Sequence, residues 1–424
     1  MKLNTYIVFQ YIIILIRIIL CPIVRVLGVF LPAISKRLDF EAKNRKMPSF
    51  NDEGHLAHSC FHVSSEGELE QCLYIILDLL ADNKRVELVY TSPSVERKCL
   101  ELDDRFENLK TFRLGVLSYP LMRFNSYVTA KRFFMCRYDF FSELMLYGAR
   151  KDVKFVLLSA SLKNKEKKLG HFMSSKFELY SEIFAASESD VQLFKKLNNR
   201  LNVREYEFRV LQISKRLKLS IKTLSARSEV AGLVECLENR DPNSSLILGS
   251  AWPDEMKIFE NEELVRKIKS GELLVVVAPH GLSTSFIDDV KNSITDELSV
   301  QVLEVGESPL PGNVVINPFP GVLVEMYKYF GHSFVGGGHG RSVHSLLEPF
   351  LAGSMVYCGP KTFRSTEYDF ILSRSEMNLV VIEELSTLAN FLKSLEREKE
   401  LIKREEIVDN YFIEYKQILD SFKC

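Results

Sequence analysis

The sequence predicts an α/β fold of two doubly wound domains, each with a parallel sheet covered by helices on both faces. The chain has 424 residues, which is enough for two domains of ordinary size. Hydrophobic residues make up 46% and charged residues 26%, the balance of a globular protein. Short apolar runs alternate with amphipathic stretches along most of the chain, and this alternation is typical of βαβ units.

The charge balance and the cysteines narrow the range of partners. A formal net charge of −1 gives no support for a nucleic-acid partner. The eight cysteines are scattered, without C-x-x-C or His-rich spacing. Such thiols are typical of a protein in a reducing compartment, and their spacing predicts neither disulfides nor a metal site.

The first residues form an unusually apolar segment. Residues 6–34 have few polar interruptions, among them Arg17 and Arg25, and basic residues follow between 36 and 46. A bilayer-spanning helix would have to accept Arg17, which costs about 3 kcal/mol at the membrane centre. A helix lying in the interface would instead let its arginines reach the headgroups. Both arrangements stay open, and both make residues 1–46 a membrane anchor whose basic end lies at the cytoplasmic leaflet.

Residues 47–217 contain the first series of strands and helices. A helix over 67–81 is expected because its apolar residues recur at helical spacing. A second helix is expected near 94–102, and a third begins at Ser187. Strands are expected over 59–64, 85–91, 112–116, 132–136, 154–159 and 182–186.

The end of this series and the rest of the chain follow the same logic. Residues 201–217 are rich in charge and irregular, which indicates a crossover between domains. Residues 218–395 then form the second domain, and residues 396–424 form a charged, solvated helix. Strands of the second domain are expected over 245–248, 273–278, 300–304, 314–316, 333–335, 355–357 and 379–382.

The most informative turn lies at residues 334–349, FVGGGHGRSVHSLLEP. Apolar spacing predicts a helix that begins near Val343, with His344 and Ser345 in its first turn. Glycine amides and a helix start can hold an anion, so the turn is a candidate nucleotide-phosphate and ribose site. An ordinary βα turn explains the same pattern. If the two domains face each other, this turn would point into a ligand cleft at the carboxyl ends of the strands.

The counterpart in the first domain is the turn at Ser64–Glu68. Ser65 followed three residues later by Glu68 has the spacing of a capping box, in which the Glu ties back to the helix start. The same Glu68 lies where it could take a proton from an acceptor hydroxyl as a general base. Spacing alone favours the cap.

Three further strand ends carry polar groups. Ser250 lies in the turn LGSAWPDE, His280 in APHG and Lys361 in GPKTFR. A hydroxyl, an imidazole and an ammonium group can each bind a phosphate or an acidic sugar. A helix cap, a structural histidine and a solvated lysine explain them as well.

Taken in order, these turns resemble the Kdo transferase family, which attaches 3-deoxy-D-manno-octulosonate (Kdo) to lipid A. The S-x-G-E loop of the family is similar to Ser65–Glu68, and its S-T-H-P-G-E turn is similar to Ser250–Glu255. The resemblance runs in register over nearly the whole chain. Further matches to P-R-H, F-V-G-G, G-H-N-P-L-E-P and F-G-P-H-M-F fall at 279–280, 334–337, 343–349 and 358–363.

The resemblance implies a GT-B glycosyltransferase, in which two Rossmann-like domains face a cleft and CMP-Kdo is the donor, without a bound metal or another cofactor. Glu68 would be the general base, and Ser65, Gly67 and Asp139 would contact the acceptor. A lipid A precursor at the cytoplasmic face of the inner membrane would be that acceptor, which suits the anchor. The donor would be held by Ser250, His280, Gly336, Gly337, Gly338, Arg341, His344, Ser345, Glu348 and Lys361.

The sequence also departs from the family pattern. The E-T-E-L-W-P segment falls near 137–142, where Asp139 stands in for its acidic residues, and the G-N-L-K segment falls near 205–208 without its Gly, Asn or Lys. The Arg of P-R-H is absent. Two alternatives therefore stay open: a GT-B transferase that uses another nucleotide sugar, and a non-catalytic membrane-bound paralogue that binds lipid A.

Overall fold

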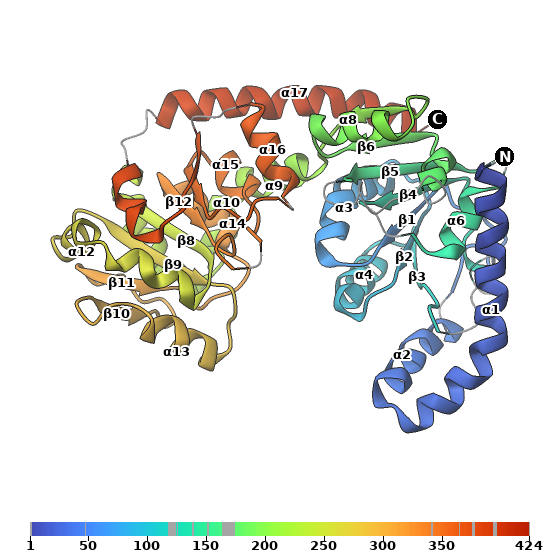
Figure 1. Ribbon diagram of the computed structural model, residues 1–424, viewed down its shortest axis with the longest axis horizontal. Helices are drawn as coiled ribbons and strands as arrows, with labels where there is room; N and C mark the ends of the chain where they lie inside the picture. The colour runs from blue at the N-terminus through green and yellow to red at the C-terminus, as the bar shows by residue number, and fades with distance from the viewer. Residues whose placement is uncertain are drawn as a thin grey trace. The chain divides into compact units, whose positions relative to one another are not determined.

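The computed structural model divides into two units (Figure 1). Unit 1 comprises Met1–Arg209 together with Leu419–Cys424, and unit 2 comprises Val210–Ile418. The chain therefore passes between the units twice, whereas the sequence suggested one boundary after residue 217. The structure describes all residues except 1, 47, 118–123, 125, 138–139, 151, 163–173, 341, 364, 375–377, 393–396 and 424.

Unit 1 is built on a parallel sheet with the strand order β3-β2-β1-β4-β5-β6-β7 among its described residues. Every residue of β1, β2 and β4 is buried, as expected for a parallel sheet covered on both faces. The strands are β1 Ser59–Val63, β2 Val86–Tyr90, β3 Leu109–Arg113, β4 Arg132–Cys136, β5 Lys154–Ala160, β6 Glu182–Ala185 and β7 Val203–Glu205.

Helices cover this sheet between successive strands. The expected helices over 67–81 and 94–102 are confirmed as α3 (Glu66–Ala81) and α4 (Pro93–Arg105). Ser187 is the N-cap of α8, as the sequence predicted, because its side chain accepts from the Asp190 backbone N–H. Within the described residues, further helical segments of the body are α6 Ser142–Gly148 and η3 Ser175–Leu179, and α8 spans Glu188–Leu197.

The stretch 201–217 contains the change of unit between Arg209 and Val210, as expected, but it is more regular than its charge suggested. Val203 lies in β7, where it pairs with Ile183 of the neighbouring strand β6. The following α9 (Arg209–Lys218) buries Val210, Leu211 and Ile213 along one face. The apolar stripe of a short helix was hidden in the sequence by the basic residues between its apolar positions.

The apolar N-terminal segment forms two helices that pack on each other. The first, α1, spans Lys2–Phe30, and α2 spans Pro32–Ala42, followed by the turn η1 at Lys43–Lys46. Leu31 has an extended backbone, and proline at the next position begins α2, since its fixed φ suits the first turn. In Figure 1, α1 runs along the outside of unit 1 beside α6 and continues past the sheet to α2.

Unit 2 repeats the doubly wound plan with the strand order β10-β11-β9-β8-β12-β13-β14 among its described residues. Each expected strand of the second domain is confirmed within a few residues. The strands are β8 Ser245–Ala251, β9 Leu274–Pro279, β10 Ser299–Val302, β11 Asn313–Ile316, β12 His332–Val335, β13 Met355–Cys358 and β14 Leu379–Val381.

The helical segments of unit 2 cover both faces of this sheet. Besides α9, the α-helices are α10 Ser220–Ser225, α11 Ala231–Glu238, α12 Glu262–Lys269, α13 Thr284–Asn292, α14 Leu323–Met326, α15 Leu347–Leu351, α16 Thr366–Leu372 and the long α17 Arg397–Lys423. The shorter 3₁₀ segments are η4 Ser228–Val230, η5 Pro242–Ser244, η6 Pro253–Glu260, η7 Tyr327–Tyr329 and η9 Leu385–Phe391.

The helix after the glycine-rich turn begins later than the sequence predicted. It starts at Leu347 rather than near Val343, so His344 and Ser345 lie in the loop before it. The carboxylate of Glu367 accepts from the Leu346 and Leu347 backbone N–H groups at 2.7 and 3.0 Å. These hydrogen bonds satisfy the first orphan amides of α15 and fix its start.

The last helix is not the fully solvated element that charge alternation suggested. Its buried side chains include Tyr415, Ile418 and Phe422. Phe422 packs edge-on against Phe134 of β4, with ring centroids 4.8 Å apart. Because Phe422 belongs to unit 1, the end of α17 completes the core of the unit that the chain began.

In each sheet the strand order reverses at the first strand of the series, and in unit 2 it also changes direction at β11. In unit 1, β1 lies between β2 and β4, and in unit 2, β8 lies between β9 and β12. The connections from such a strand leave toward opposite faces, which opens a crevice at its carboxyl end. Ligands of open parallel sheets bind in this crevice, so the residues after β1, β4, β8 and β12 are the first to consider.

Candidate functional site

Glu68 lies at the switch point of unit 1, in the turn from β1 into α3. Its side chain is 7% exposed, and its Oε2 accepts from the backbone N–H and the hydroxyl of Ser64 at 2.6 and 2.8 Å. The Ser65 hydroxyl in turn caps the Glu68 N–H at 3.3 Å. The cap is therefore real, but the carboxylate binds Ser64 rather than the N-cap amide. Gly67 is exposed, with open space where a Cβ would stand.

A positive charge accompanies Glu68 in the same crevice. Arg137 follows β4 with a φ of +56°, a conformation that is uncommon for a residue with a side chain. The Gln71 amide oxygen, oriented to satisfy both groups, accepts from Arg137 Nε and Nη2 at 2.7 and 2.9 Å. The neighbouring Cys136 thiol donates to the Glu68 carbonyl at 3.6 Å. Arg137 was not singled out in the sequence, and Asp139 lies outside the described residues.

A buried histidine on β1 is a weak base and is poorly suited to the acid–base chemistry of this crevice. His62 forms a 2.7 Å hydrogen bond with the Thr91 hydroxyl. Burial lowers the pKa of His62 to about 3, so the imidazole stays neutral near pH 7. Glu68 is therefore the better candidate base at the end of this strand.

The switch point of unit 2 carries a stack of three rings. Trp252 follows β8, His280 follows β9, and His344 follows the glycine-rich turn after β12. The ring centroids of Trp252 and His280 are 4.5 Å apart, and those of His280 and His344 are 4.4 Å apart. The indole N–H of Trp252 also donates to His344 Nε2 at 3.3 Å. The structure thus brings the two sequence-predicted histidines together with the chain's tryptophan.

Ser250 interrupts the regular end of β8 two residues before Trp252. Its φ is +52°, and the pairing of β8 with β9 shifts register between Gly249 and Ala251. Residues with side chains adopt this left-handed region at a cost of order 1 kcal/mol, and such outliers cluster at functional sites. The position of Ser250 agrees with its sequence-based candidacy as a donor contact, which stays a prediction.

The glycine-rich turn is organised around a carboxylate of the chain itself. Glu255 of η6 accepts from the Gly337 N–H through Oε1 at 2.7 Å and from the Trp252 N–H through Oε2 at 3.0 Å. Burial raises the pKa of Glu255 to about 7, opposed by these hydrogen bonds. A Cβ on Gly336 would lie 2.3 Å from the Ser250 carbonyl oxygen. The Gly337 amide, proposed from the sequence as an anion donor, is already engaged within the protein.

The glycines serve close packing as much as ligand access. Gly337 has a φ of +91°, and a Cβ on it would lie 2.4 Å from the Ser342 carbonyl oxygen. A Cβ on Gly338 would lie 2.6 Å from the Gly359 nitrogen. Only glycine fits at these positions, so the turn is held tightly between β8 and β13.

The other predicted donor residues surround the turn. The ammonium of Lys361 donates to the carbonyls of His339 and Gly340, the first at 3.0 Å, and so closes the turn from outside. The Ser345 hydroxyl donates to Glu367 at 3.2 Å, and Glu348 lies in the first turn of α15. Arg341 lies outside the described residues.

Two acidic residues that sequence reasoning did not select are thus central to the site. Glu255 stands three residues after Trp252, which is the position of a capping Glu, and that spacing was the available signal. Glu367 lies on α16, and nothing in the sequence links it to α15. Within the described part of the chain, no group of three or more His, Cys, Asp or Glu side chains could hold a metal ion.

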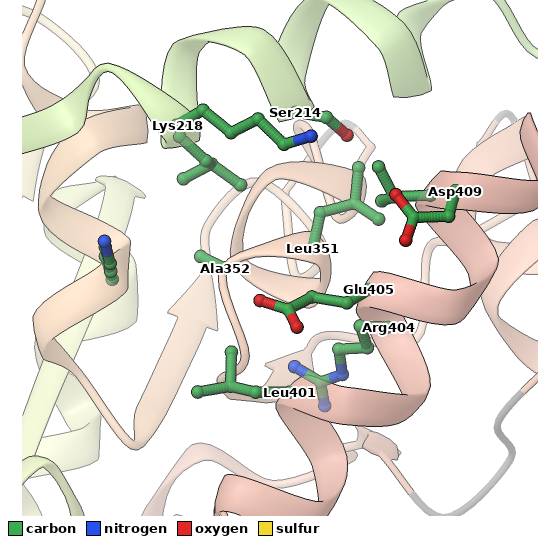
Figure 2. Close-up of a pocket in the computed structure, with 11 residues that line it drawn as sticks. Ser214, Lys218, Leu351, Ala352, Leu401, Arg404, Glu405 and Asp409 are labelled. Carbon is green, nitrogen blue, oxygen red and sulfur yellow. The ribbon is translucent and has the colours of Figure 1, made fainter. Parts of the chain in front are cut away.

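A separate pocket of about 320 Å³ lies elsewhere in unit 2 (Figure 2). Lys328 of η7 and Leu351 of α15 line it, and these segments lead into the amino ends of β12 and β13. The pocket is therefore on the opposite edge of the sheet from the switch point. Its other lining residues are Ser214, Leu217, Lys218, Ala352, Leu401, Arg404, Glu405, Val408 and Asp409.

Comparison with known proteins assigns the fold. No protein-family model matches the sequence, and no curated protein matches it significantly. Among solved structures, a UDP-GlcNAc 2-epimerase from Methanocaldococcus jannaschii is 11% identical with a TM-score of 0.54, covering 80% of this chain and 94% of that chain. A UDP-glucosyltransferase from Polygonum tinctorium is 9% identical with a TM-score of 0.52, covering 89% of this chain and 100% of that one.

These likenesses give the chain the GT-B fold, which glycosyltransferases and nucleotide-sugar epimerases share. The expected fold class is thereby confirmed. The C-terminal CMP-Kdo binding domain of WaaA from Acinetobacter baumannii is also similar, at 20% identity over 46% of this chain and 97% of that domain. Its TM-score of 0.35 is too low to assign a donor.

Proposed function

We propose that the chain is a membrane-associated glycosyltransferase that transfers Kdo, or a closely related acidic sugar, from its CMP conjugate to lipid A or a lipid A-like precursor. The observation that carries the proposal is the presence of polar clusters at the switch points of both sheets in a GT-B fold. Glu68 lies in the first, and Ser250, His280 and His344 lie in the second. The choice of Kdo rests on the order of the sequence motifs.

The reaction would be a direct displacement at the anomeric carbon of the donor sugar. Glu68 takes the proton of the acceptor hydroxyl, whose oxygen forms the new bond to the anomeric carbon. The bond from that carbon to the CMP phosphate oxygen breaks, and CMP leaves with its electron pair. The imidazoles of unit 2 and the Lys361 ammonium supply donors for the departing phosphate.

The occupied amides of unit 2 favour a monophosphate leaving group over a diphosphate. A diphosphate commonly sits against a glycine-rich turn and a helix N-terminus, where backbone amides neutralise its charge. Here Glu255 engages the Gly337 amide, and Glu367 engages the Leu346 and Leu347 amides. A CMP-sugar places a single phosphate in the site and needs fewer such donors.

The test is transfer from CMP-Kdo, generated in situ, to a tetraacyl lipid A precursor, followed by mass spectrometry. Wild type should add one or more Kdo units, and Glu68→Ala should lower the rate at least ~100-fold. Glu66→Ala is the matched control, because Glu66 lies on the same helix turn but pairs with Lys98 at the surface. Equal loss in both variants, or no loss in either, would contradict the role of Glu68 as base.

A folded wild type that transfers no Kdo would contradict the choice of donor. UDP-sugars would then be assayed with the same acceptor, since the solved structures of similar fold include UDP-sugar enzymes. No transfer from any donor, with retained binding of the lipid A precursor, would favour the non-catalytic paralogue.

A further inference from the structure

The N-terminal helix α1 leaves most of its circumference uncovered, and that surface is apolar. Ile19 is 64% exposed, Val26 is 60%, and Val29 is 79%. Over residues 3–31, all of which the structure describes, Arg25 is the charged residue on the exposed side. The remaining exposed apolar residues of α1 are Val8, Phe9, Tyr11, Ile12, Leu15, Ile16, Leu20, Ile23, Leu27 and Phe30.

The opposite stripe of α1 is fastened along the body of unit 1. Tyr6, Gln10, Ile14 and Cys21 are 1–5% exposed and recur at the spacing of one helix face. They lie where α1 packs on α6 and η3. This seam extends over more than four turns, so residues 6–21 run along the globular body before the helix continues past the sheet to α2 (Figure 1).

Arg17 strengthens the seam with charge. Its guanidinium forms an ion pair with Glu143 of α6, whose side chain is 1% exposed. The same guanidinium donates to the carbonyls of Gly115 and Val116 at 3.0 and 2.6 Å. Burial raises the pKa of Glu143, and the Arg17 charge opposes that rise. A transmembrane helix would have to bury Arg17 in lipid, whereas here Arg17 is paired with groups of unit 1.

A bilayer-spanning α1 is incompatible with this seam. To cross the membrane alone, the helix would have to leave α6, which would strand Glu143 as a buried charge without Arg17. Removing the partner of a buried charge in this way is strongly destabilising. Crossing with the seam intact would drag the polar body of unit 1 into the hydrocarbon.

A lipid surface is the occupant that fits the uncovered face. The face is a long apolar strip, and Arg25 with the exposed Lys36 adds positive charge near its end. Interfacial helices combine an apolar face with such basic residues, which are attracted to anionic headgroups. A second copy of the chain would bring the same positive charges together.

We propose that α1 lies in the plane of an anionic bilayer, its outer face in the lipid and its inner face on unit 1, and does not span the membrane. This deepens the membrane association in the proposed function and is independent of the donor or the reaction. The outer face would sit about 5–10 Å into the boundary between headgroups and acyl chains. The body of unit 1 would then rest directly on the surface that carries a lipid acceptor.

The test is the depth of nitroxide labels along the helix. Single cysteines replace Ile12, Ile19 or Val26 in the full chain, with the less buried Cys236 and the terminal Cys424 changed to serine. Labelled proteins are bound to vesicles of phosphatidylglycerol and phosphatidylethanolamine. Accessibility to oxygen and to a nickel chelate then gives the depth of each label. Ile221→Cys, at an exposed apolar position of unit 2, is the aqueous control.

An in-plane helix gives similar shallow depths at all three positions. A spanning helix gives depths that differ strongly, because these positions are spread over about 21 Å of helix axis at a rise of 1.5 Å per residue. That gradient would overturn the proposal. Labels that never reach lipid but broaden one another's spectra would overturn it as well, since they would show a second copy on the face.

Vesicle flotation gives a second measurement that does not require labels. The double variant Ile12→Glu/Ile19→Glu should lower binding to anionic vesicles at least tenfold, and Ile221→Glu should not. Both variants alter exposed positions, so both should keep the wild-type thermal midpoint. Activity is not a readout here, so failure of this proposal and failure of the proposed reaction are separable.

Discussion

The backbone N–H of Gly337 donates to Oε1 of Glu255 at 2.7 Å, so a side chain from η6 holds the turn that follows β12. The same carboxylate holds the Trp252 N–H after β8. One buried acid therefore joins the two loops of the unit 2 switch point. Its protonation state should control how firmly these two loops are held together.

If unit 2 binds CMP as proposed, its affinity for CMP should depend on the protonation of Glu255. With a pKa of about 7, Glu255 is ionised above pH 7, where its two oxygens accept from both amides. Below pH 7 the carboxyl is protonated, and the oxygen that carries the proton is a poorer acceptor for its amide. Glu255→Gln imitates the protonated form at every pH. The ratio of wild-type to Glu255→Gln affinity, measured by calorimetry, should be about tenfold at pH 8 and should approach one at pH 6. A ratio that does not change with pH would contradict this role.

Alanine at Gly336 should disrupt the site, whereas alanine at Gly340 should not. The new Cβ at Gly336 would lie 2.3 Å from the Ser250 carbonyl oxygen and 2.6 Å from Glu255 Oε2, but at Gly340 the nearest atom is 3.9 Å away. Overpacking of this kind costs about 1–3 kcal/mol. The Gly336→Ala variant should have a lower free energy of unfolding in urea and a lower affinity for CMP. Equal behaviour of the two variants would show that the turn adapts freely.

Glu87 should make the stability of unit 1 depend on pH. This buried carboxylate on β2 accepts from the Thr129 N–H at 2.9 Å and from the Ala130 N–H at 3.2 Å. Burial raises its pKa from 4.5 to about 7, so between these values the unfolded chain releases the proton first. The unfolding free energy should therefore fall as pH rises through this window, by about 3 kcal/mol at most.

The Glu87→Gln variant isolates this contribution, because it has no proton to lose. Subtracting its unfolding free energy from that of wild type should give a difference that declines between pH 4.5 and 7. A constant difference over this range would show that the folded carboxyl titrates normally, and a rising one would show that folding lowers its pKa; either would contradict the prediction.

Trp252 should report on the histidine stack, since it is the only tryptophan in the sequence. Protonated imidazole quenches indole fluorescence, and His280 lies against the Trp252 ring at 4.5 Å. Burial lowers the pKa of His344, with the His280 charge adding to the effect. The fluorescence emission of wild type should rise as the pH increases. The part of this rise that disappears in His344→Gln should have a midpoint below pH 6.5. CMP should remove this pH dependence if it occupies the stack.

The strands could be predicted from the sequence more reliably than the contacts at their ends. Continuous apolar runs such as Leu274–Pro279 identify buried parallel strands because both faces of the sheet are covered. The capping serines at 65 and 187 marked two helix starts through local hydrogen bonding. Local spacing carries this information because the interactions join residues within one turn.

The missed features depend on residues that are distant in the sequence. Glu367 sets the start of α15 from 21 residues away, and Arg17 meets Glu143 across 126 residues. Helical spacing near Val343 could not reveal that another helix already satisfies those amides. The choice of Glu68 came from local spacing together with the family resemblance, while its hydrogen bonds to Ser64 required the folded turn.

The packing of Phe422 against Phe134 and Phe184 has a consequence for synthesis on the ribosome. Residues 210–418 are translated before Phe422, yet Phe422 belongs to the core of unit 1. The first domain therefore leaves the ribosome without Phe422 in its core. That aromatic side chain can be added only after the whole second domain has been synthesised. Shortening the chain by its last few residues should then weaken the domain at the far end of the sequence, and a nascent chain stalled before residue 419 should be more sensitive to protease within residues 48–209 than the finished protein.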